Sequence, residues 1–270
     1  MNKLDRSLRE LREMDTLAAG TSPVHGLCPI AKLLTTIAYI AVVLSFGKYQ
    51  LSGLLVMMLW PLLLFQLSGI PVATCFRKLR FVLSLVLAVG LFNPIFDRSP
   101  LLTMGTVTVS GGVVSMITLM AKGVFCLMAS FLLVATTPID SLCAALRRLH
   151  VPSVLVTLLL LTYRYVGVMT EELAVMTDAY HLRAPGQKGI HYTAWGSFLG
   201  QLLLRSMDRA EEIYGSMQLR GLRGDFPYAR ARSCTARDGA WLILWTAAFV
   251  LCRIFDVAQL LGGLVGGGAR

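Results

Sequence analysis

The sequence predicts an all-α membrane protein with about five transmembrane helices and a cytoplasmic block that contains two long amphipathic helices. Three observations lead to this fold class: 56% of the residues are hydrophobic, only 15% are charged, and the mean hydropathy is +0.67. A chain of 270 residues has room for several membrane spans and one basic cytoplasmic portion, but not for a nucleotide-binding domain of ordinary size as well. We therefore expect one integral membrane domain.

The basic character of the chain agrees with a membrane location. Its formal net charge is +10 at pH 7, and lysine and arginine accumulate in the cytoplasmic loops of membrane proteins. We therefore expect the lipid bilayer, and no nucleic acid, as a partner. Residues 1–15 interleave acids and bases without an apolar core, so they are no cleavable secretory signal and are expected in the cytoplasm.

Apolar runs in the first half of the chain are expected to cross the membrane at residues 30–46, 51–67, 81–96 and 113–135. The basic residues Arg77, Lys78 and Arg80 follow the second run, which returns to the side of the N-terminus, in agreement with the positive-inside rule. Between the third and fourth runs, Pro100 and several glycines indicate a loop with room for a short hairpin. A fifth span is expected at residues 240–255.

The apolar segment 151–169 also has the hydropathy of a span, but we predict that it does not cross the membrane. If it crossed, Arg164 would lie deep in the hydrocarbon, and the basic residues between Glu171 and Asp238 would face the outside, against the charge asymmetry of the earlier loops. We expect a helix packed against the bundle, with Glu171, Glu172 or a backbone carbonyl as the partner of a buried Arg164. The basic residues concerned are Arg183, Lys188, Arg205, Arg209, Arg220, Arg223, Arg230, Arg232 and Arg237.

Two amphipathic helices are expected between the fourth and fifth spans, because apolar residues recur there at every third or fourth position. Those of the first helix are Leu161, Tyr165, Met169, Leu173, Met176 and Tyr180, and those of the second are Leu199, Leu203, Met207, Ala210, Tyr214 and Met217. The predicted domains are therefore residues 1–136 with the N-terminal segment and four spans, 137–238 with the cytoplasmic helices, and 239–270 with the last span and tail.

Both amphipathic helices end in similar triplets, Leu182, Arg183 and Ala184 in the first and Leu219, Arg220 and Gly221 in the second. Each helix then meets a breaker, which is Pro185 in one and Gly221 in the other. A basic residue in the last turn complements the helix dipole, and this explanation suffices for one copy. Two copies at equivalent ends favour a second explanation, in which each guanidinium enters an acidic groove on a partner protein and donates charge-assisted hydrogen bonds there.

The sequence offers no pattern for metal binding or nucleotide binding. Its histidines, His25, His150, His181 and His191, lack the spacing of metal ligands, and it has no Gly-x-x-x-x-Gly-Lys-Ser/Thr loop that could hold ATP phosphates. We therefore predict that the chain itself binds no metal and no cofactor. Without any Cys-x-x-Cys pair, the six cysteines are interpreted as small buried hydrophobic residues instead of disulfides or zinc ligands. They are Cys28, Cys75, Cys126, Cys143, Cys234 and Cys252.

Motifs over most of the chain resemble those of the CbiQ family, the transmembrane coupling components of energy-coupling-factor transporters for cobalt. These motifs are "LDR" at 4–6, "SPVHGLCPIAKLL" at 22–34, "TTPIDSLCAALRRLHVP" at 136–152, "TYRYVGVMTEE" at 162–172 and the two triplets. Three positions depart from the family pattern. The first triplet is Leu-Arg-Ala followed by proline instead of Ala-Arg-Gly, Cys28 stands where the family often has an acid, and Lys122 stands where arginine is usual.

The resemblance implies a non-catalytic subunit of an importer in the inner membrane of a prokaryotic cell. Its two cytoplasmic helices would dock through the two triplets on two ABC ATPase subunits, which bind the ATP. They would transmit the ATP-driven motion to a substrate-binding membrane subunit, and a small auxiliary membrane subunit is a further implied partner. Cobalt is the implied substrate, with nickel or a vitamin as alternatives.

Two alternatives from other classes are a scaffold that assembles partners without transport and an intramembrane hydrolase. The pairs Glu171–Glu172 and Glu211–Glu212 are similar to the glutamate pair of one intramembrane peptidase family. That family has an arginine four residues after the second glutamate, where this chain has Met176 and Ser216. The hydrolase is therefore disfavoured, whereas the scaffold stays open.

Overall fold

The computed structural model describes residues 13–48, 50–96, 100–104, 107–187, 189–221 and 234–254. The "LDR" motif, Lys188, Arg223, Arg230 and Arg232 lie outside the described residues. The chain forms two compact units, which we call the bundle unit (residues 17–138 and 232–270) and the crossing-helix unit (residues 1–16 and 139–231). The sequence-based division placed its boundaries after residues 136 and 238 instead.

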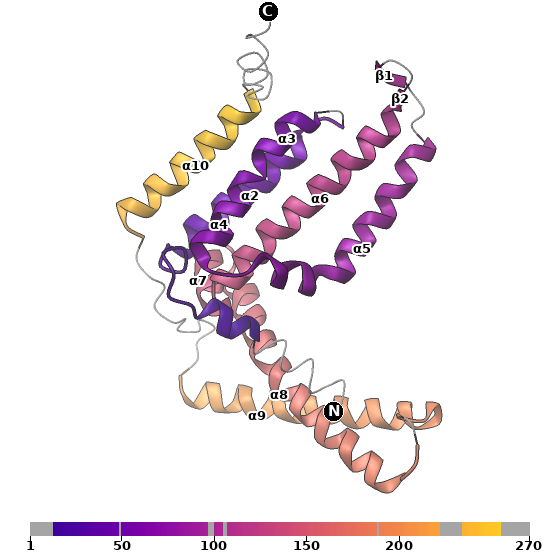
Figure 1. Ribbon diagram of the computed structural model, residues 1–270. Coiled ribbons are helices and arrows are strands. Elements are labelled where there is room, and N and C mark those ends of the chain that lie inside the picture. Colours follow the sequence, from indigo (N-terminus) through magenta and orange to yellow (C-terminus); the bar gives the residue numbers. More distant parts are fainter. Residues whose placement is uncertain are drawn as a thin grey trace, which may run out of the picture. The chain divides into compact units, whose positions relative to one another are not determined.

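The bundle unit consists of apolar helices that lie side by side (Figure 1). Helix α2 packs against both α10 and α6, and α5 packs against α6. Strands β1 and β2 form an antiparallel hairpin between α5 and α6, which confirms the hairpin expected there. The elements are α2 (Pro29–Ser45), α3 (Leu51–Met57), α4 (Leu59–Ser68), α5 (Val72–Phe96), β1 (Pro100–Met104), β2 (Val107–Ser110), α6 (Gly111–Thr136) and α10 (Ala236–Ile254).

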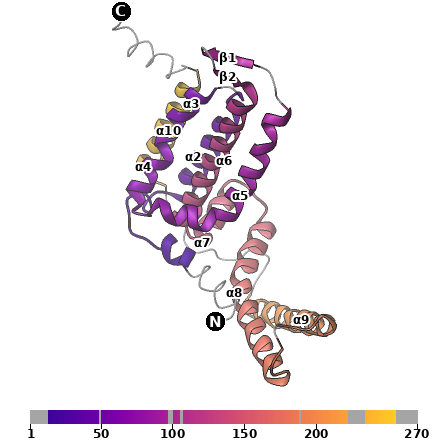
Figure 2. The same ribbon diagram turned by 45° about the vertical axis from the view of Figure 1, so that its right-hand side comes forward.

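The crossing-helix unit contains two long helices, of which α9 runs across α8 instead of alongside it (Figures 1 and 2). A short helix, α7, packs against the start of α8 around Cys143, Val156 and Leu160, which form a small buried cluster. The elements of this unit are α7 (Ile139–Arg148), α8 (Ser153–Arg183), the 3-10 turn η1 (Tyr192–Ala194) and α9 (Trp195–Leu219).

The second expected span is divided into α3 and α4, and Pro61 explains the break. Proline has no backbone N–H, so the carbonyl of Met57, four residues earlier, loses its helical donor. The Tyr39 hydroxyl of α2 donates a hydrogen bond of 3.0 Å to this carbonyl oxygen. Tyr39 is fully buried and stacks on Trp60 with 4.4 Å between ring centroids. A side chain from a neighbouring helix thus satisfies the backbone group that proline leaves without a partner.

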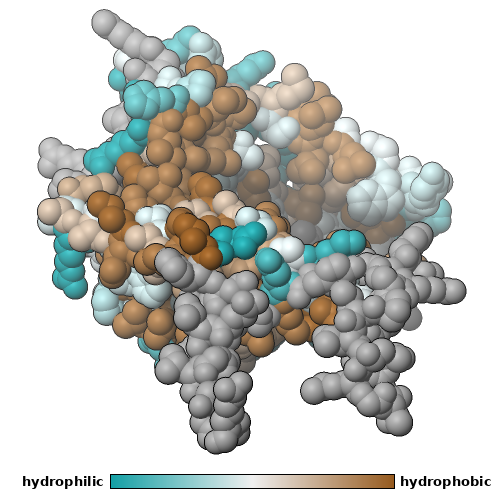
Figure 3. All heavy atoms as spheres, turned by 90° about the horizontal axis from the view of Figure 1, so that it is seen from above, coloured by the Kyte–Doolittle hydropathy of each residue, from teal (hydrophilic) through white to brown (hydrophobic). Residues whose placement is uncertain are grey.

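Large apolar side chains reach the surface of the bundle, as expected for helices that face lipid. Ile37 and Leu44 of α2 and Phe81 and Leu85 of α5 are all exposed, and the view in Figure 3 shows broad hydrophobic areas. Exposed apolar surface of this extent needs an apolar surrounding. The chain is therefore an all-α membrane protein, as predicted.

Length and composition identify two long helices that could cross a membrane among the described residues, α6 and α8. The apolar helices at Pro29–Ser45 and Gly53–Ser68 are shorter. Helix α8 passes this test although the sequence analysis kept its first half out of the membrane. The number of spans, expected to be about five, therefore stays a prediction.

One disulfide corrects the interpretation of the cysteines. Cys28 and Cys234 are bonded, with 5.3 Å between their Cα atoms, although they are 206 residues apart in the chain. Cys28 precedes α2 and Cys234 precedes α10, so the pairing of these two helix starts brings the cysteines together. No local spacing in the sequence reveals such a contact. Cys75, Cys126, Cys143 and Cys252 are free thiols, of which Cys75 and Cys143 are buried as expected.

Small residues allow α5 and α6 to approach each other closely. A Cβ atom on Gly123 would lie 2.6 Å from Cγ1 of Val86, and one on Gly90 would lie 3.0 Å from Cγ of Met120. Both distances are shorter than ordinary van der Waals contact. The two glycines therefore set the separation of these helices, as small residues do in other membrane bundles.

We expect Gly123→Ala to lower the stability of the protein by about 1–3 kcal/mol, because the added methyl group forces the helices apart. The thermal midpoint of the purified protein in detergent measures this loss. Gly167→Ala is the matched control, since a Cβ at Gly167 of α8 meets no atom within 4 Å. Adding Val86→Ala should restore much of the midpoint, and an equal loss with and without it would contradict the packing explanation.

Candidate functional site

Helices α8 and α9 form the frame of the candidate site. The sequence pattern predicted two amphipathic helices here, and the structure confirms both. Helix α8 is longer than its apolar pattern, because the segment from Ser153 and the amphipathic stretch are one continuous helix of 31 residues. Only Val156 and Leu160 of this helix are fully buried, while its other residues are half-buried or exposed.

An ion pair joins the two helices where they cross. Nη1 of Arg205 on α9 donates a hydrogen bond of 2.9 Å to Oε1 of Glu172 on α8. The expectation of a buried Arg164 that pairs with an acid of its own helix is wrong, since Arg164 is exposed and Glu172 pairs with α9. The sequence analysis missed Arg205 as a partner because the two residues lie on different helices, so their spacing along the chain carries no signal.

An apolar groove lies along the crossing and has a volume of about 320 Å³. Its walls are formed by residues of the two predicted apolar stripes, so the stripes face a shared space. Arg209, Ser206 and Thr162 add polar atoms to the lining. The apolar lining residues are Leu161, Tyr165, Met169, Ala210, Ile213, Tyr214 and Met217.

The first triplet lies at the C-terminal end of α8. Arg183 is the last helical residue and Ala184 is the C-cap, whose N–H donates a hydrogen bond of 3.0 Å to the Tyr180 carbonyl. Leu182 is 84% exposed. The following loop folds back on the helix, because the Tyr180 hydroxyl donates to Oε1 of Gln187 at 2.9 Å and accepts from the His191 N–H at 3.1 Å. The loop thereby braces this helix end.

The second triplet lies at the C-terminal end of α9. Leu219 is the last helical residue and is 92% exposed, and Arg220 is the C-cap. Gly221 adopts a φ of +82°, a left-handed conformation that favours glycine and ends the helix. The N–H of Gly221 donates to the Gln218 carbonyl at 2.9 Å. The chain thus stops sharply after the arginine.

The two triplets have the same pair of exposed side chains. Each presents an exposed leucine beside an exposed arginine at a helix end. Neither Arg183 nor Arg220 forms an ion pair with another residue that the structure describes. An exposed leucine next to an arginine can bury apolar surface and donate bidentate hydrogen bonds to a carboxylate on a partner protein. The two triplets lie at the ends of separate helices, α8 and α9.

Within the described part of the chain, no three side chains of histidine, cysteine, aspartate or glutamate lie close enough together to hold a metal ion. Two of the described histidines have hydrogen bonds of their own. His25 bonds to Ser22 and to the Leu17 carbonyl, and His191 bonds to Thr193.

Residues 20–228 match the family profile described as "Cobalt transport protein", CbiQ. The chain is 31% identical over 103 residues to the nickel permease LarQ of Lactiplantibacillus plantarum, and 34% identical over 122 residues to the cobalt transport protein CbiQ of Rhodobacter capsulatus. These alignments cover 38% and 44% of this chain, and 38% and 49% of the two relatives, so the chain matches less than half the length of either. A longer match, 26% identical over 268 residues, covers 90% of this chain and 93% of the energy-coupling factor transporter transmembrane protein EcfT of Listeria innocua.

Proposed function

Because the chain belongs to the CbiQ family of cobalt transport proteins, we propose that it is the non-catalytic coupling component of an energy-coupling-factor importer in the cell membrane of a prokaryote. It would transmit ATP-driven motion from two ABC ATPase subunits to a substrate-binding membrane subunit. One observation carries this proposal: two long crossing helices each end in an exposed leucine and arginine followed by a small residue.

The two helix ends supply the contacts to the ATPase subunits. Each guanidinium would enter an acidic groove on one ATPase, and the exposed leucine beside it would be buried in the same contact. The small residues Ala184 and Gly221 leave the arginines accessible from the side of the partner. Two equivalent ends suit two ATPase subunits. Helix capping alone is therefore the weaker explanation of the arginines.

The apolar groove at the crossing supplies the contact to the substrate-binding membrane subunit. Leu199, Leu203 and Met207 of α9 continue the apolar surface beyond the groove and are more than half exposed. A surface of this kind is stable in water only when another apolar surface covers it. A membrane subunit that reaches the cytoplasmic side offers such a surface, and a small auxiliary membrane subunit would complete the complex.

Cobalt is the proposed substrate, and the family description supports it. Nickel is the second candidate because one of the relatives is named a nickel permease. A vitamin is a third, since the relatives aligned over nine-tenths of the chain are named only as energy-coupling factor transporter proteins. The substrate-binding subunit would select among them, and this chain would serve any of them in the same way.

Uptake into proteoliposomes tests the proposal. The chain is reconstituted with the ATPase subunits and the substrate-binding subunit of its own organism, and the uptake of labelled cobalt and nickel is measured with ATP. We expect uptake of one metal that requires this chain, and none when the ATPases carry a substitution that blocks hydrolysis. A complex that assembles but transports neither metal nor a vitamin would favour the scaffold. Protein cleavage by the chain alone would favour the hydrolase.

A further inference from the structure

The chain passes between its two units at three places, between residues 16 and 17, between 138 and 139, and between 231 and 232. Movement of the crossing-helix unit that is transmitted along the backbone must enter the bundle unit through the bundle segments that adjoin these places. Each segment is held inside the bundle unit by hydrogen bonds or by a covalent bond. All of these bonds lead to the first turn of α2.

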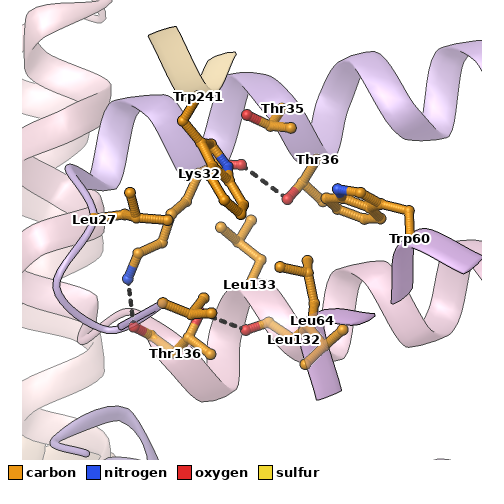
Figure 4. Close-up of a pocket in the computed structure, with 11 residues that line it drawn as sticks. Leu27, Lys32, Thr35, Thr36, Trp60, Leu64, Leu132, Leu133, Thr136 and Trp241 are labelled. Carbon is orange, nitrogen blue, oxygen red and sulfur yellow. Dashed lines mark hydrogen bonds between the residues drawn. The ribbon is translucent and has the colours of Figure 1, made fainter. Parts of the chain in front are cut away.

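Lys32 holds the segment at the end of α6. The residue is buried, with 7% of its surface exposed. The ammonium group donates a hydrogen bond of 2.7 Å to the Thr136 carbonyl, as Figure 4 shows, and a longer one of 3.4 Å to Oγ1 of Thr137. Thr136 is the last residue of α6, so the cation also lies at the negative end of the helix dipole.

The same lysine holds the segment that follows the first connection. Its ammonium group donates a third hydrogen bond, of 3.3 Å, to the His25 carbonyl. The ring of His25 is bonded in turn to the carbonyl of Leu17, the first residue of the bundle unit, at 2.9 Å from Nε2. One ammonium group therefore links the entry of the N-terminal segment to the exit of α6.

Asp238 and Cys28 hold the third segment. Asp238 is 5% exposed and accepts a hydrogen bond of 3.3 Å from the Cys28 N–H at Oδ1 and one of 2.9 Å from the Thr235 N–H at Oδ2. The disulfide between Cys28 and Cys234 joins the same two chain segments covalently. Cys28 and Lys32 are one helical turn apart, and the N–H of Lys32 donates to the Cys28 carbonyl at 3.2 Å.

The surroundings of Lys32 suit neither kind of transported substrate, since its positive charge repels a metal cation and an organic molecule finds no room there. The cavity beside it, lined by Thr35, Thr36, Trp60 and Trp241 among others, has a volume of only about 20 Å³, enough for a single water molecule (Figure 4). A buried ammonium group is costly unless its N–H groups donate hydrogen bonds, and an apolar side chain would fill this place without that cost. Unlike an apolar side chain, Lys32 donates hydrogen bonds that hold the segments at His25 and Thr136.

We propose that the first turn of α2, through Lys32 and Asp238, is the junction at which movement of the crossing-helix unit enters the membrane bundle. This inference rests on the proposed coupling function and extends it to two positioning residues that contact neither ATP nor substrate. Helix α2 suits the role because it packs against both α6 and α10, the helices at which the second and third segments end or begin.

Lys32→Met tests the junction in the reconstituted complex. The variant keeps the length of the side chain and loses the hydrogen bonds of the ammonium group to His25, Thr136 and Thr137. We expect the ATPase subunits to stay bound and ATP hydrolysis to continue, while substrate uptake per ATP hydrolysed falls about tenfold, the factor that corresponds to one lost hydrogen bond to a charged group. Lys48→Met, at an exposed lysine in the turn after α2, is the matched control and should leave the ratio unchanged.

The ratio of uptake to hydrolysis separates positioning from mere folding, because loss of folded complex lowers both rates together. Lys32→Arg, which keeps the charge and the donors, should recover part of the ratio. Asp238→Asn keeps the shape of its side chain and should lower the ratio by itself. An unchanged ratio in Lys32→Met and in Asp238→Asn would overturn the junction, as would a loss of assembly in both. Absence of ATP-driven uptake in the wild-type complex would instead refute the proposed function.

Discussion

Replacing both Arg183 and Arg220 with glutamate is expected to release the ATPase subunits from the purified complex and to abolish substrate uptake. Each guanidinium that enters an acidic groove is stabilised there by charge-assisted hydrogen bonds. Glutamate would bring like charges together in a desolvated contact, at a cost of about 2–5 kcal/mol for each site. A single replacement leaves one contact in place and should only weaken coupling, whereas the double replacement removes both contacts and should lose the ATPases.

Arg164→Glu is the control for this charge change, because Arg164 is an exposed arginine of α8 that is far along the helix from its end. It should leave ATPase retention unchanged. Arg183→Lys and Arg220→Lys add a second comparison, since lysine keeps the charge but loses the planar fork of donors. If the arginines serve only the helix dipole, lysine should cost no more than a few tenths of a kcal/mol. Full ATPase retention in the double glutamate variant would reduce the triplets to helix caps.

The crossing of α8 and α9 determines how far apart these two contacts lie. The helix from Glu172 to Arg183 is about 16 Å long and that from Arg205 to Arg220 about 22 Å, at a rise of about 1.5 Å per residue. A small rotation at the Glu172–Arg205 pair therefore becomes a displacement of several ångströms at the triplets. The pair is too exposed to add much stability, so its effect is on the angle between the helices.

Hydrophobic patterning predicted the helices well, because the period of the apolar residues and the helix breakers are local properties. The ends of α8 and α9 fall at the triplets for this reason, with Gly221 in the left-handed conformation that a terminating glycine adopts. Patterning also identified the apolar stripes, and the structure shows that residues of both, from Leu161 to Met169 and from Ala210 to Met217, line one groove.

Contacts between distant segments could not be predicted in the same way. The break at Pro61 was visible as a proline, but nothing local indicated that the Tyr39 hydroxyl would bond to the Met57 carbonyl. Cys28 and Cys234 each looked like a lone cysteine. Lys32 is the residue that the sequence analysis could have used and did not. It is a lysine inside an apolar run, where a charge needs several hydrogen-bond acceptors.

The side of the membrane on which α8 ends decides whether the docking contacts can exist. Helix α8 has the length and the composition of a membrane span. Arg164 would cost about 3 kcal/mol near the centre of the hydrocarbon, which a run of leucines and valines could offset. Hydropathy alone therefore does not settle its position. The basic residues that follow α8 favour a cytoplasmic end, since a crossing would carry Arg183, Arg205, Arg209 and Arg220 to the outside.

We expect a cysteine introduced by Ile190→Cys to be inaccessible from outside the cell and accessible from the cytoplasm. The experiment uses a variant without its native cysteines and a membrane-impermeant maleimide, applied to intact cells and then to inverted membrane vesicles. Lys48→Cys is the matched reporter for the opposite side, because the turn between α2 and α3 is expected outside, and it should react only in intact cells. Strong labelling of Ile190→Cys in intact cells would show that α8 crosses the membrane. Arg183 and Arg220 would then lie where no ATP-hydrolysing subunit can reach them, and the coupling function would fail with the topology.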